Sequence, residues 1–216
     1  MSNSSEKINF LMYAYLRIEP NILIDLNNKE NLRNAIHKCL KKAYQDIKRN
    51  VPYRNSIKYI DEMNCEKRKE YCFLKQSYLA EIEQRILERL IDIDNINPRK
   101  IIMDILEVQN NEKYAMLFSA NKRFTLGLAQ KWVNMTLKYL WIIGVLDDNS
   151  AKVLDAPIDS NIIKKISEME INIKVRNWSD WDNFEEYIKV QDELQKILLE
   201  DNLTRIQWEN AQWIKK

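Results

Sequence analysis

The chain has 216 residues, of which 45% are hydrophobic, so it can bury a core in one domain without a stabilising metal or disulfide. Three cysteines without paired spacing (Cys39, Cys65 and Cys72) and a single histidine (His37) exclude a zinc site and indicate reduced thiols. The start of the chain lacks a signal-peptide pattern, and no stretch approaches the roughly 18 apolar residues of a membrane helix. We therefore expect a cytoplasmic protein that does not enter a membrane.

Turn-forming residues are scarce, since the chain has only two glycines and four prolines. A sheet-rich fold of this size would need many turns built from those residues. We predict an all-α fold: a single globular multi-helix domain over residues 1–216. An alternative division has residues 1–110 as a helical part that packs on residues 111–216.

Charge is unevenly distributed along the chain despite a net charge of only +2. Residues 29–58 carry nine Lys or Arg against two acidic residues, and residues 99–144 add a net +4. Residues 145–216 carry ten basic against fifteen acidic side chains. The basic segments favour an anionic partner such as nucleic acid, and ordinary solvated helix faces are the simpler alternative.

Helical periodicity dominates the first half of the sequence. Residues 8–18 are apolar and favour a short helix over a strand, and residues 30–49 have one apolar stripe flanked by basic residues. Residues 66–92 follow the same period, although their charged first half is also compatible with a separate helix. A helix over 98–108 begins at a proline, and a short helical segment covers 113–120.

Two helix-start signals mark the last third. Ser179 precedes the periodic segment 180–199, and Thr204 with Gln207 three residues later predicts a capping box. The segment 180–199 has an apolar face that we expect to point inward: Phe184, Tyr187, Ile188, Gln191, Leu194 and Leu198. Four tryptophans lie in or beside these helices, and core packing explains them better than stacking on bases: Trp178, Trp181, Trp208 and Trp213.

The best-defined helix lies between the two glycines of the chain, Gly127 and Gly144. Gly144 suits the left-handed residue that closes a helix, and Gly127 permits a close backbone approach at the first turn. Apolar residues cover most of the circumference, so we expect this helix to be buried.

Lys131, Asn134 and Lys138 form a narrow polar strip on this helix, because offsets of three, four and seven residues return to one face. For an arbitrary lysine, the simpler explanation is that its stem covers apolar surface while its ammonium reaches solvent. The alternative is a lysine held in a cleft, where burial or a second cation frees the amine to act as a nucleophile.

Asp159 follows Pro157 at the point where another apolar-periodic helix begins. An aspartate in this position accepts backbone N–H bonds and caps the helix, which is its ordinary role. The same fixed carboxylate can also deprotonate or stabilise a reacting centre.

Gln130-Lys131, Lys138 and Pro157-Ile158-Asp159 together resemble the helix-hairpin-helix DNA glycosylase/lyase superfamily, over roughly residues 124–166. The similarity is greatest to its archaeal 8-oxoguanine DNA glycosylase branch, which has a second lysine seven residues after the first. The family's Leu-Pro-Gly-x-Gly hairpin is reduced here to Leu126-Gly127. Residues 110–216 also resemble a group of uncharacterised bacterial proteins, through AQKWVNMTLKYLW and WSDWDNFEEY.

The glycosylase resemblance implies a helical cleft that extrudes a damaged base and attacks the sugar through a lysine amine, without metal or cofactor. Lys131 would be the nucleophile and Asp159 would activate it or stabilise the sugar cation. Lys138 would favour the neutral amine or contact phosphate. Nucleic-acid contacts would come from Lys122, Arg123, Gly127, Gln130 and Asn134. An extruded base would lie against an aromatic residue such as Phe124, Trp132 or Trp141, unless these belong to the core.

Two further functions stay open. The first is a catalytically silent helical module that binds nucleic acid or protein, which the reduced hairpin and the near-neutral total charge favour. The second is a hydrolase with paired carboxylates such as Asp180/Asp182 or Glu185/Glu186, which is weaker because such pairs are usually surface charge. The sequence does not indicate an oligomeric state.

Overall fold

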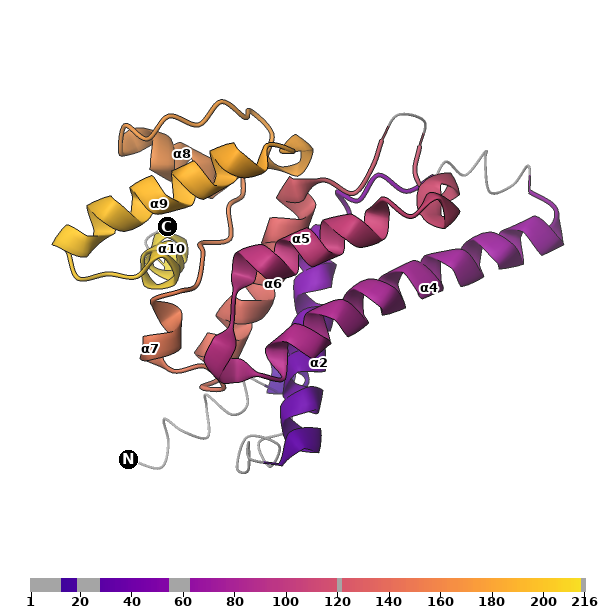
Figure 1. Cartoon of the computed structure of the whole chain (residues 1–216), viewed down its shortest axis with the longest axis horizontal. Helices are drawn as coiled ribbons and strands as arrows, with labels where there is room; N and C mark the ends of the chain where they lie inside the picture. Colours follow the sequence, from indigo (N-terminus) through magenta and orange to yellow (C-terminus); the bar gives the residue numbers. More distant parts are fainter. Residues whose placement is uncertain (1–12, 19–27, 55–62, 120–121, 215–216) are drawn as a thin grey trace.

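The computed structural model describes residues 13–18, 28–54, 63–119 and 122–214, and these ranges are predominantly helical (Figure 1). The only strand-like pairing among them is an isolated bridge between Tyr53 and Phe118. The predicted all-α class is therefore confirmed. Of the helix predicted over residues 8–18, one helical turn at 13–16 lies within the described residues, and residues 8–12 lie outside them.

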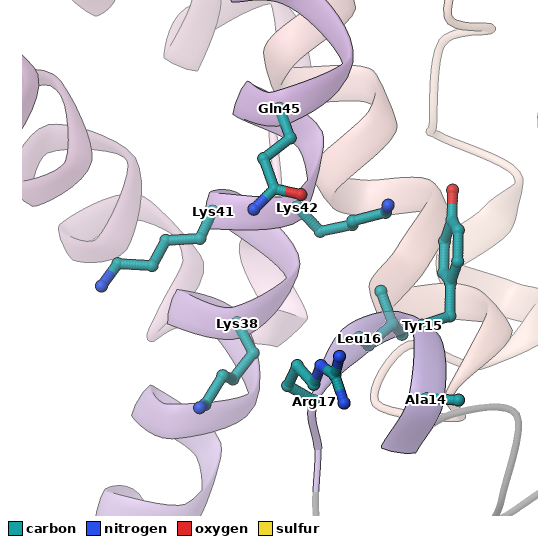
Figure 2. Close-up of a pocket in the computed structure, with 8 residues that line it drawn as sticks. All are labelled: Ala14, Tyr15, Leu16, Arg17, Lys38, Lys41, Lys42 and Gln45. Atoms are coloured by element: carbon teal, nitrogen blue, oxygen red, sulfur yellow. The ribbon is translucent and has the colours of Figure 1, made fainter.

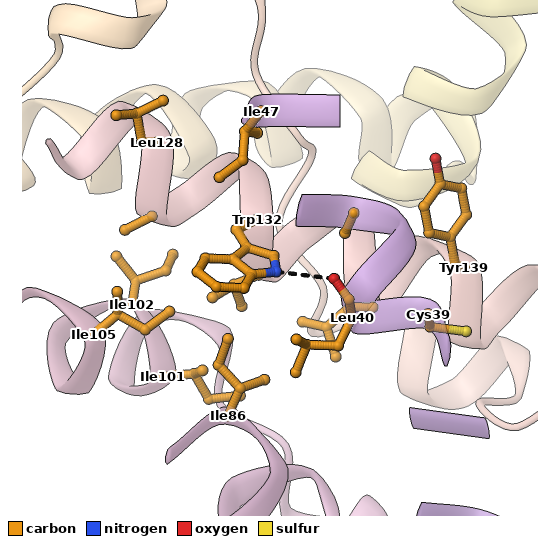
Figure 3. Packing of buried hydrophobic residues seen from close by; sticks show 14 of the residues in the cluster. Cys39, Leu40, Ile47, Ile86, Ile101, Ile102, Ile105, Leu128, Trp132 and Tyr139 are labelled. Carbon is orange, nitrogen blue, oxygen red and sulfur yellow. Dashed lines mark hydrogen bonds between the residues drawn. The ribbon is translucent and has the colours of Figure 1, made fainter. Parts of the chain in front are cut away.

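Helix α6 (Leu126–Ile142) forms the centre of the domain, between α2 (Lys29–Ile47) and α5 (Pro98–Gln109). As expected, almost every α6 residue is buried. Figure 3 shows Trp132 in the middle of the resulting core, where its indole Nε1 donates a hydrogen bond to the Leu40 carbonyl oxygen at 3.0 Å. The apolar stripes of α2 and α6 thus define how these two helices pack.

Helix α4 (Cys65–Leu90) is continuous, so the alternative of a separate helix in its charged first half is wrong. Its second half packs on α5, which begins at Pro98 as predicted. Most of its first turns are exposed and extend to the right in Figure 1, away from α2. Within the short helical segment predicted over 113–120, the structure has a 3-10 helix, η3 (Glu112–Leu117), and residue 120 lies outside the described residues.

The C-terminal helices form the other side of the domain (Figure 1): α7 (Asp148–Ala151), α8 (Ser160–Glu168), α9 (Phe184–Glu200) and α10 (Arg205–Ile214). The capping box before α10 is confirmed, because the Thr204 backbone N–H donates to Gln207 Oε1 at 3.0 Å and the Gln207 N–H to Thr204 Oγ1 at 3.3 Å. On α9, Tyr187, Val190, Gln191, Leu194 and Leu198 are buried.

The start predicted for α9 is wrong. Asn183, not Ser179, caps this helix, and its side chain accepts the Glu186 backbone N–H at 2.9 Å. Ser179 lies in a short 3-10 helix, η4 (Trp178–Asp180), where Thr125 Oγ1 donates to its carbonyl oxygen at 2.6 Å. This tertiary contact competes with the local capping preference of serine.

Both glycines have the roles that the sequence predicted. Gly144 adopts φ +77° after the last turn of α6, where other residues are strained. A Cβ added to Gly127 would lie 1.7 Å from the Trp178 carbonyl oxygen, so only glycine allows η4 to pack this closely on α6. The backbone N–H of Gly127 also donates to the Trp181 carbonyl oxygen at 2.8 Å.

Candidate functional site

The structure brings Lys131 and Asp159 together, although they are 28 residues apart. Lys131 Nζ on α6 lies 2.9 Å from Asp159 Oδ2 at the start of α8, and the two side chains are 12% and 10% exposed. The ammonium also lies 4.6 Å from the centroid of the Trp178 ring. Lys131 is therefore held in a semi-enclosed environment rather than extended into solvent.

Asp159 uses its two carboxylate oxygens for different purposes. Oδ1 accepts the backbone N–H groups of Asn161 and Ile162, at 2.9 and 3.1 Å, which confirms the predicted helix cap. Oδ2 is left for Lys131. The cap fixes the carboxylate, so the lysine faces an acceptor of defined orientation.

Lys138 lies two turns further along α6 and pairs with Glu209 of α10. Lys138 Nζ lies 2.6 Å from Glu209 Oε2, and these side chains are only 7% and 1% exposed. The other oxygen, Oε1, accepts the Trp213 indole N–H at 2.6 Å. Burial raises the pKa of Glu209 above its ordinary value, while Lys138 opposes this effect and Asp159 adds to it.

A pocket of about 490 Å³ opens beside the two lysines. Its volume falls within the range of roughly 300–1,000 Å³ that is typical of small-molecule sites. Elements from the start, middle and end of the chain line it: Tyr15, Asp46, Lys131, Met135, Lys138, Tyr139, Ile142, Asn210 and Trp213. The two paired lysines thus lie in the wall of a cavity with aromatic sides.

The pocket also contains a chain of hydroxyl groups. Tyr139 donates its hydroxyl proton to Asp46 Oδ2 at 2.6 Å, and its oxygen lies 3.1 Å from the Tyr15 hydroxyl. Burial, followed by the hydrogen bond to Asp46, raises the pKa of Tyr139 well above its ordinary value. Tyr139 therefore keeps its proton and acts as a donor at neutral pH.

Gln130 and Asn134, predicted as nucleic-acid contacts, are fully buried and do not line the pocket. Gln130 holds the segment before α8, because its Nε2 donates to the Ile158 carbonyl oxygen at 2.7 Å and its Oε1 accepts the Ile158 N–H at 3.1 Å. Asn134 Nδ2 donates to the Tyr187 hydroxyl oxygen at 2.9 Å. In this structure both side chains position Asp159 indirectly, and their contact with nucleic acid stays a prediction.

A buried ionic network supports the same segment from the other side. Asp155 is fully buried and lies 3.1 Å from both Arg99 Nε and Arg205 Nη1. Arg205 Nε also donates to the Leu154 carbonyl oxygen at 3.0 Å. The residues leading to Asp159 are therefore held by charged groups from α5 and α10.

The remaining predicted nucleic-acid contacts, Lys122, Arg123 and Gly127, do not line the pocket. Lys122 is exposed, and Arg123 Nε donates to Asp182 Oδ2 at 2.8 Å. Gly127 is buried against η4. The structure thus does not gather these three residues around the pocket, and their contact with nucleic acid is untested.

Aromatic residues expected to sandwich a base divide into two groups. Phe124 and Trp132 are completely buried, so the alternative that they belong to the core is confirmed. Trp141 is partly buried and donates its indole N–H to Asp148 Oδ1 at 3.0 Å. The aromatic side chains that line the pocket are instead Tyr15, Tyr139 and Trp213.

The sequence did not single out Glu209, Asp46, Tyr15 or Tyr139 as site residues. It did single out Trp213, but as a core residue; this prediction is wrong, because Trp213 is 41% exposed and lines the pocket. Glu209 is 71 residues from Lys138 and Asp46 is 93 residues from Tyr139, so no local spacing connects them. A weak signal exists for Trp213, since it follows Glu209 by four residues and therefore shares its helix face.

Comparisons with known proteins bring no assignment: no family model, curated protein or solved structure matches the chain. Within the described ranges, no three His, Cys, Asp or Glu side chains are grouped so that they could hold a metal ion. Nor does any helix there have the length and apolar character needed to cross a bilayer.

Proposed function

We propose that this protein processes nucleic acid as a DNA glycosylase/lyase-like enzyme, with Lys131 as the nucleophile. The observation that supports this most strongly is the 2.9 Å contact between Lys131 Nζ and Asp159 Oδ2 beside a pocket of about 490 Å³. A nucleophile and a proton acceptor within hydrogen-bond reach are the minimum that amine catalysis requires.

The reaction begins with transfer of a proton from the Lys131 ammonium to Asp159. The neutral amine attacks the sugar C1′, and the bond from C1′ to the base breaks with its electron pair leaving on the base, which takes up a proton. Loss of the amine proton and opening of the sugar ring, with protonation of the ring oxygen, give an imine between Lys131 and C1′. Water then hydrolyses the imine and restores the free amine.

The low exposure of Lys131 and Asp159 favours the transfer of a proton from the lysine to the aspartate. In the free protein the lysine and the aspartate form an ion pair that is only 12% and 10% exposed. A base that enters the pocket removes further water, and desolvation disfavours an ion pair relative to its neutral form. Substrate binding would therefore free the Lys131 amine for attack.

The pocket wall suits an extruded nucleobase. Tyr15, Tyr139 and Trp213 present aromatic surface of the kind on which bases stack. The Tyr139 hydroxyl and the Asn210 side chain add polar groups for the edge of the base. These contacts support a nucleotide unit as the substrate class and leave the identity of the base open.

A catalytically silent binding module is the second candidate. It is favoured by the pairing of both strip lysines with carboxylates and by burial of Gly127, at the position where the family has its DNA-gripping hairpin. In that case the ion pairs would stabilise the fold and the pocket would only bind.

Borohydride trapping on DNA duplexes that contain an abasic site or 8-oxoguanine distinguishes the two candidates. Hydride reduces the imine to a stable amine, so an active protein becomes covalently attached to DNA. We expect this adduct with the wild type and with Lys164→Ala, which removes an exposed lysine of α8, but not with Lys131→Ala or Lys131→Gln.

The variant Asp159→Asn distinguishes the role of Asp159 as a helix cap from its proposed role as a proton acceptor. Asparagine and aspartate are equally good helix caps, but asparagine does not accept a proton. We expect the variant to remain folded, with a loss of stability because Lys131 loses its partner, and to form the adduct about 100-fold more slowly or worse. An adduct that persists in the Lys131 variants would assign the reaction to another amine. No adduct from folded wild-type protein would leave the binding module.

A further inference from the structure

A second pocket, of about 440 Å³, lies between residues 14–17 and the middle of α2 (Figure 2). Four of the eight residues that line it are cationic, and none is acidic: Ala14, Tyr15, Leu16, Arg17, Lys38, Lys41, Lys42 and Gln45. We call these eight residues the basic pocket. We infer that the basic pocket binds phosphate groups of a nucleic-acid strand.

The cations reach the basic pocket from two elements. Lys38, Lys41 and Lys42 share one face of α2, since they are three and four residues apart. Arg17 faces them from the turn after residues 13–16, with φ +58°, a left-handed conformation that is uncommon for arginine. Figure 2 shows its guanidinium on the side of this turn that faces α2. Such local strain is retained where the surrounding structure uses the resulting orientation.

The charges of the basic pocket have no acidic partner among the residues that the structure describes. In the described part of the chain, no carboxylate oxygen lies within 4.0 Å of the cationic groups of these four residues. Lys42 Nζ instead lies 3.8 Å from the centroid of the Tyr15 ring. On α6, in contrast, both Lys131 and Lys138 have carboxylate partners. Unpaired cations around a concave surface create the positive potential that attracts anions.

His37 reports this potential, because it is adjacent to Lys38 and one turn before Lys41. Its pKa is lowered from the ordinary value of 6.5 first by burial and then by Lys41, with a smaller contribution from Lys38. Glu83, whose Oε2 lies 3.9 Å from His37 Nδ1, opposes the effect. The field of the basic pocket therefore extends along α2 and is not cancelled by the nearest acidic side chain.

The basic pocket adjoins the pocket beside Lys131, and this favours phosphates of a nucleic-acid backbone over free phosphate as its ligand. Tyr15 lines both pockets, so a chain of linked phosphates can occupy the basic pocket while one nucleotide lies beside Lys131. Three lysines act as point charges that tolerate variation in phosphate position, as expected for backbone contacts without sequence preference. This assignment rests on the proposed function for the nucleotide in the first pocket, but the phosphate contacts can be measured without any reaction.

Fluorescence anisotropy with an undamaged single-stranded oligonucleotide tests the inference directly. We expect Lys38→Ala/Lys41→Ala to weaken binding on the order of tenfold to a hundredfold at low salt. The slope of log K against log salt should become shallower by about 0.7 for each lysine removed. Lys67→Ala/Lys69→Ala is the matched control, because it removes two exposed lysines from the distant first turns of α4 and should change neither quantity.

Three outcomes would overturn the inference. Equal losses in the test and control variants would show that attraction is spread over the whole surface. Unchanged binding in the test variant would exclude the basic pocket. Saturable binding of inorganic phosphate that the test variant loses, with oligonucleotide binding intact at matched ionic strength, would assign the pocket to free phosphate. Because the oligonucleotide is undamaged, the anisotropy result does not depend on whether borohydride trapping succeeds. Likewise, a negative anisotropy result does not decide whether Lys131 forms an imine.

Discussion

Two sets of lysines in this protein have opposite environments. Lys131 and Lys138 on α6 are almost buried, and each faces a carboxylate from another helix. Lys38 and Lys41 on α2 line an open pocket without an acidic partner among the described residues. Under the two proposals above, the same side chain serves structure and chemistry in one set and electrostatic attraction in the other.

The difference lies in desolvation. A buried charge is tolerated only with a partner, so removing one member of a buried pair leaves the other in an unfavourable environment. An exposed cation keeps its water and can be removed with little effect on folding. Variants of the two sets should consequently separate effects on stability from effects on binding.

Lys138→Ala should have the largest effect on stability. Glu209, whose side chain is 1% exposed, would remain buried without its cation, and we expect the free energy of unfolding to fall by about 3–5 kcal/mol. Urea unfolding followed by circular dichroism measures this loss. The double variant Lys138→Met/Glu209→Leu removes both charges and should recover most of it, whereas a loss below about 1 kcal/mol in the single variant would mean that Glu209 is solvated.

The pH dependence of that loss gives a second measurement. Since burial raises the pKa of Glu209 in the folded protein, the folded state binds this proton more tightly than the unfolded state. The contribution of Glu209 to stability is therefore full below its ordinary pKa of 4.5 and decreases as pH rises through the folded value. Without Lys138 the pKa of folded Glu209 should be higher still, so the decrease should continue to higher pH and be larger in total. The variant should therefore be more destabilised at pH 8 than at pH 5. An equal loss at both values would contradict this.

Gly127→Ala should have an intermediate effect. The added Cβ would lie 1.7 Å from the Trp178 carbonyl oxygen, so η4 must move, and we expect a loss of roughly 1–3 kcal/mol in thermal unfolding. If Gly127 instead served only to approach nucleic acid, the variant would keep its unfolding temperature and lose affinity. Gly144→Ala is a useful comparison, because its strain comes from φ +77° and not from a steric contact.

Lys38→Ala/Lys41→Ala should change stability by less than about 0.5 kcal/mol per site, despite its expected effect on oligonucleotide binding. Differential scanning calorimetry at low ionic strength is the appropriate measurement. A clear stabilisation would indicate that the cations of the basic pocket repel one another strongly in the free protein. A clear destabilisation would mean that Lys38 and Lys41, like Lys131 and Lys138, contribute to folding.

The smallest effect concerns the pKa of His37, the only histidine of the chain. Lys41→Ala removes a cation that disfavours the imidazolium form, so the pKa should rise towards its ordinary value of 6.5 without reaching it, because burial remains the main cause. A single imidazole resonance in an NMR titration makes this shift measurable. A lower pKa in the variant would contradict the positive potential inferred for α2.

The helices themselves were largely predictable, because their signals are local. Pro98 starts α5, Gly144 ends α6, and the Thr204 and Gln207 side chains cap α10, all as expected. The start of α9 was not predictable, because serine and asparagine are both good caps and only the contact of Thr125 with Ser179 decides between them.

The candidate site was predictable only in part. The resemblance brought Lys131 and Asp159 into one hypothesis, and they are in contact. The polar strip of α6 was recognised as needing an explanation, but Asn134 turned out to bond within the core. The partners Glu209 and Asp46 come from distant helices, and helical periodicity contains no information on which helices meet.

The contact between α2 and α6 also affects how the chain acquires its structure. Trp132 and Leu40 are 92 residues apart, so at roughly 5–20 residues per second a ribosome needs on the order of 5–20 s to supply the partner of α2. During that interval the apolar stripe of α2 has no α6 to cover it. Association between such distant segments is intrinsically slow, so the nascent N-terminal half is the species most in need of a chaperone.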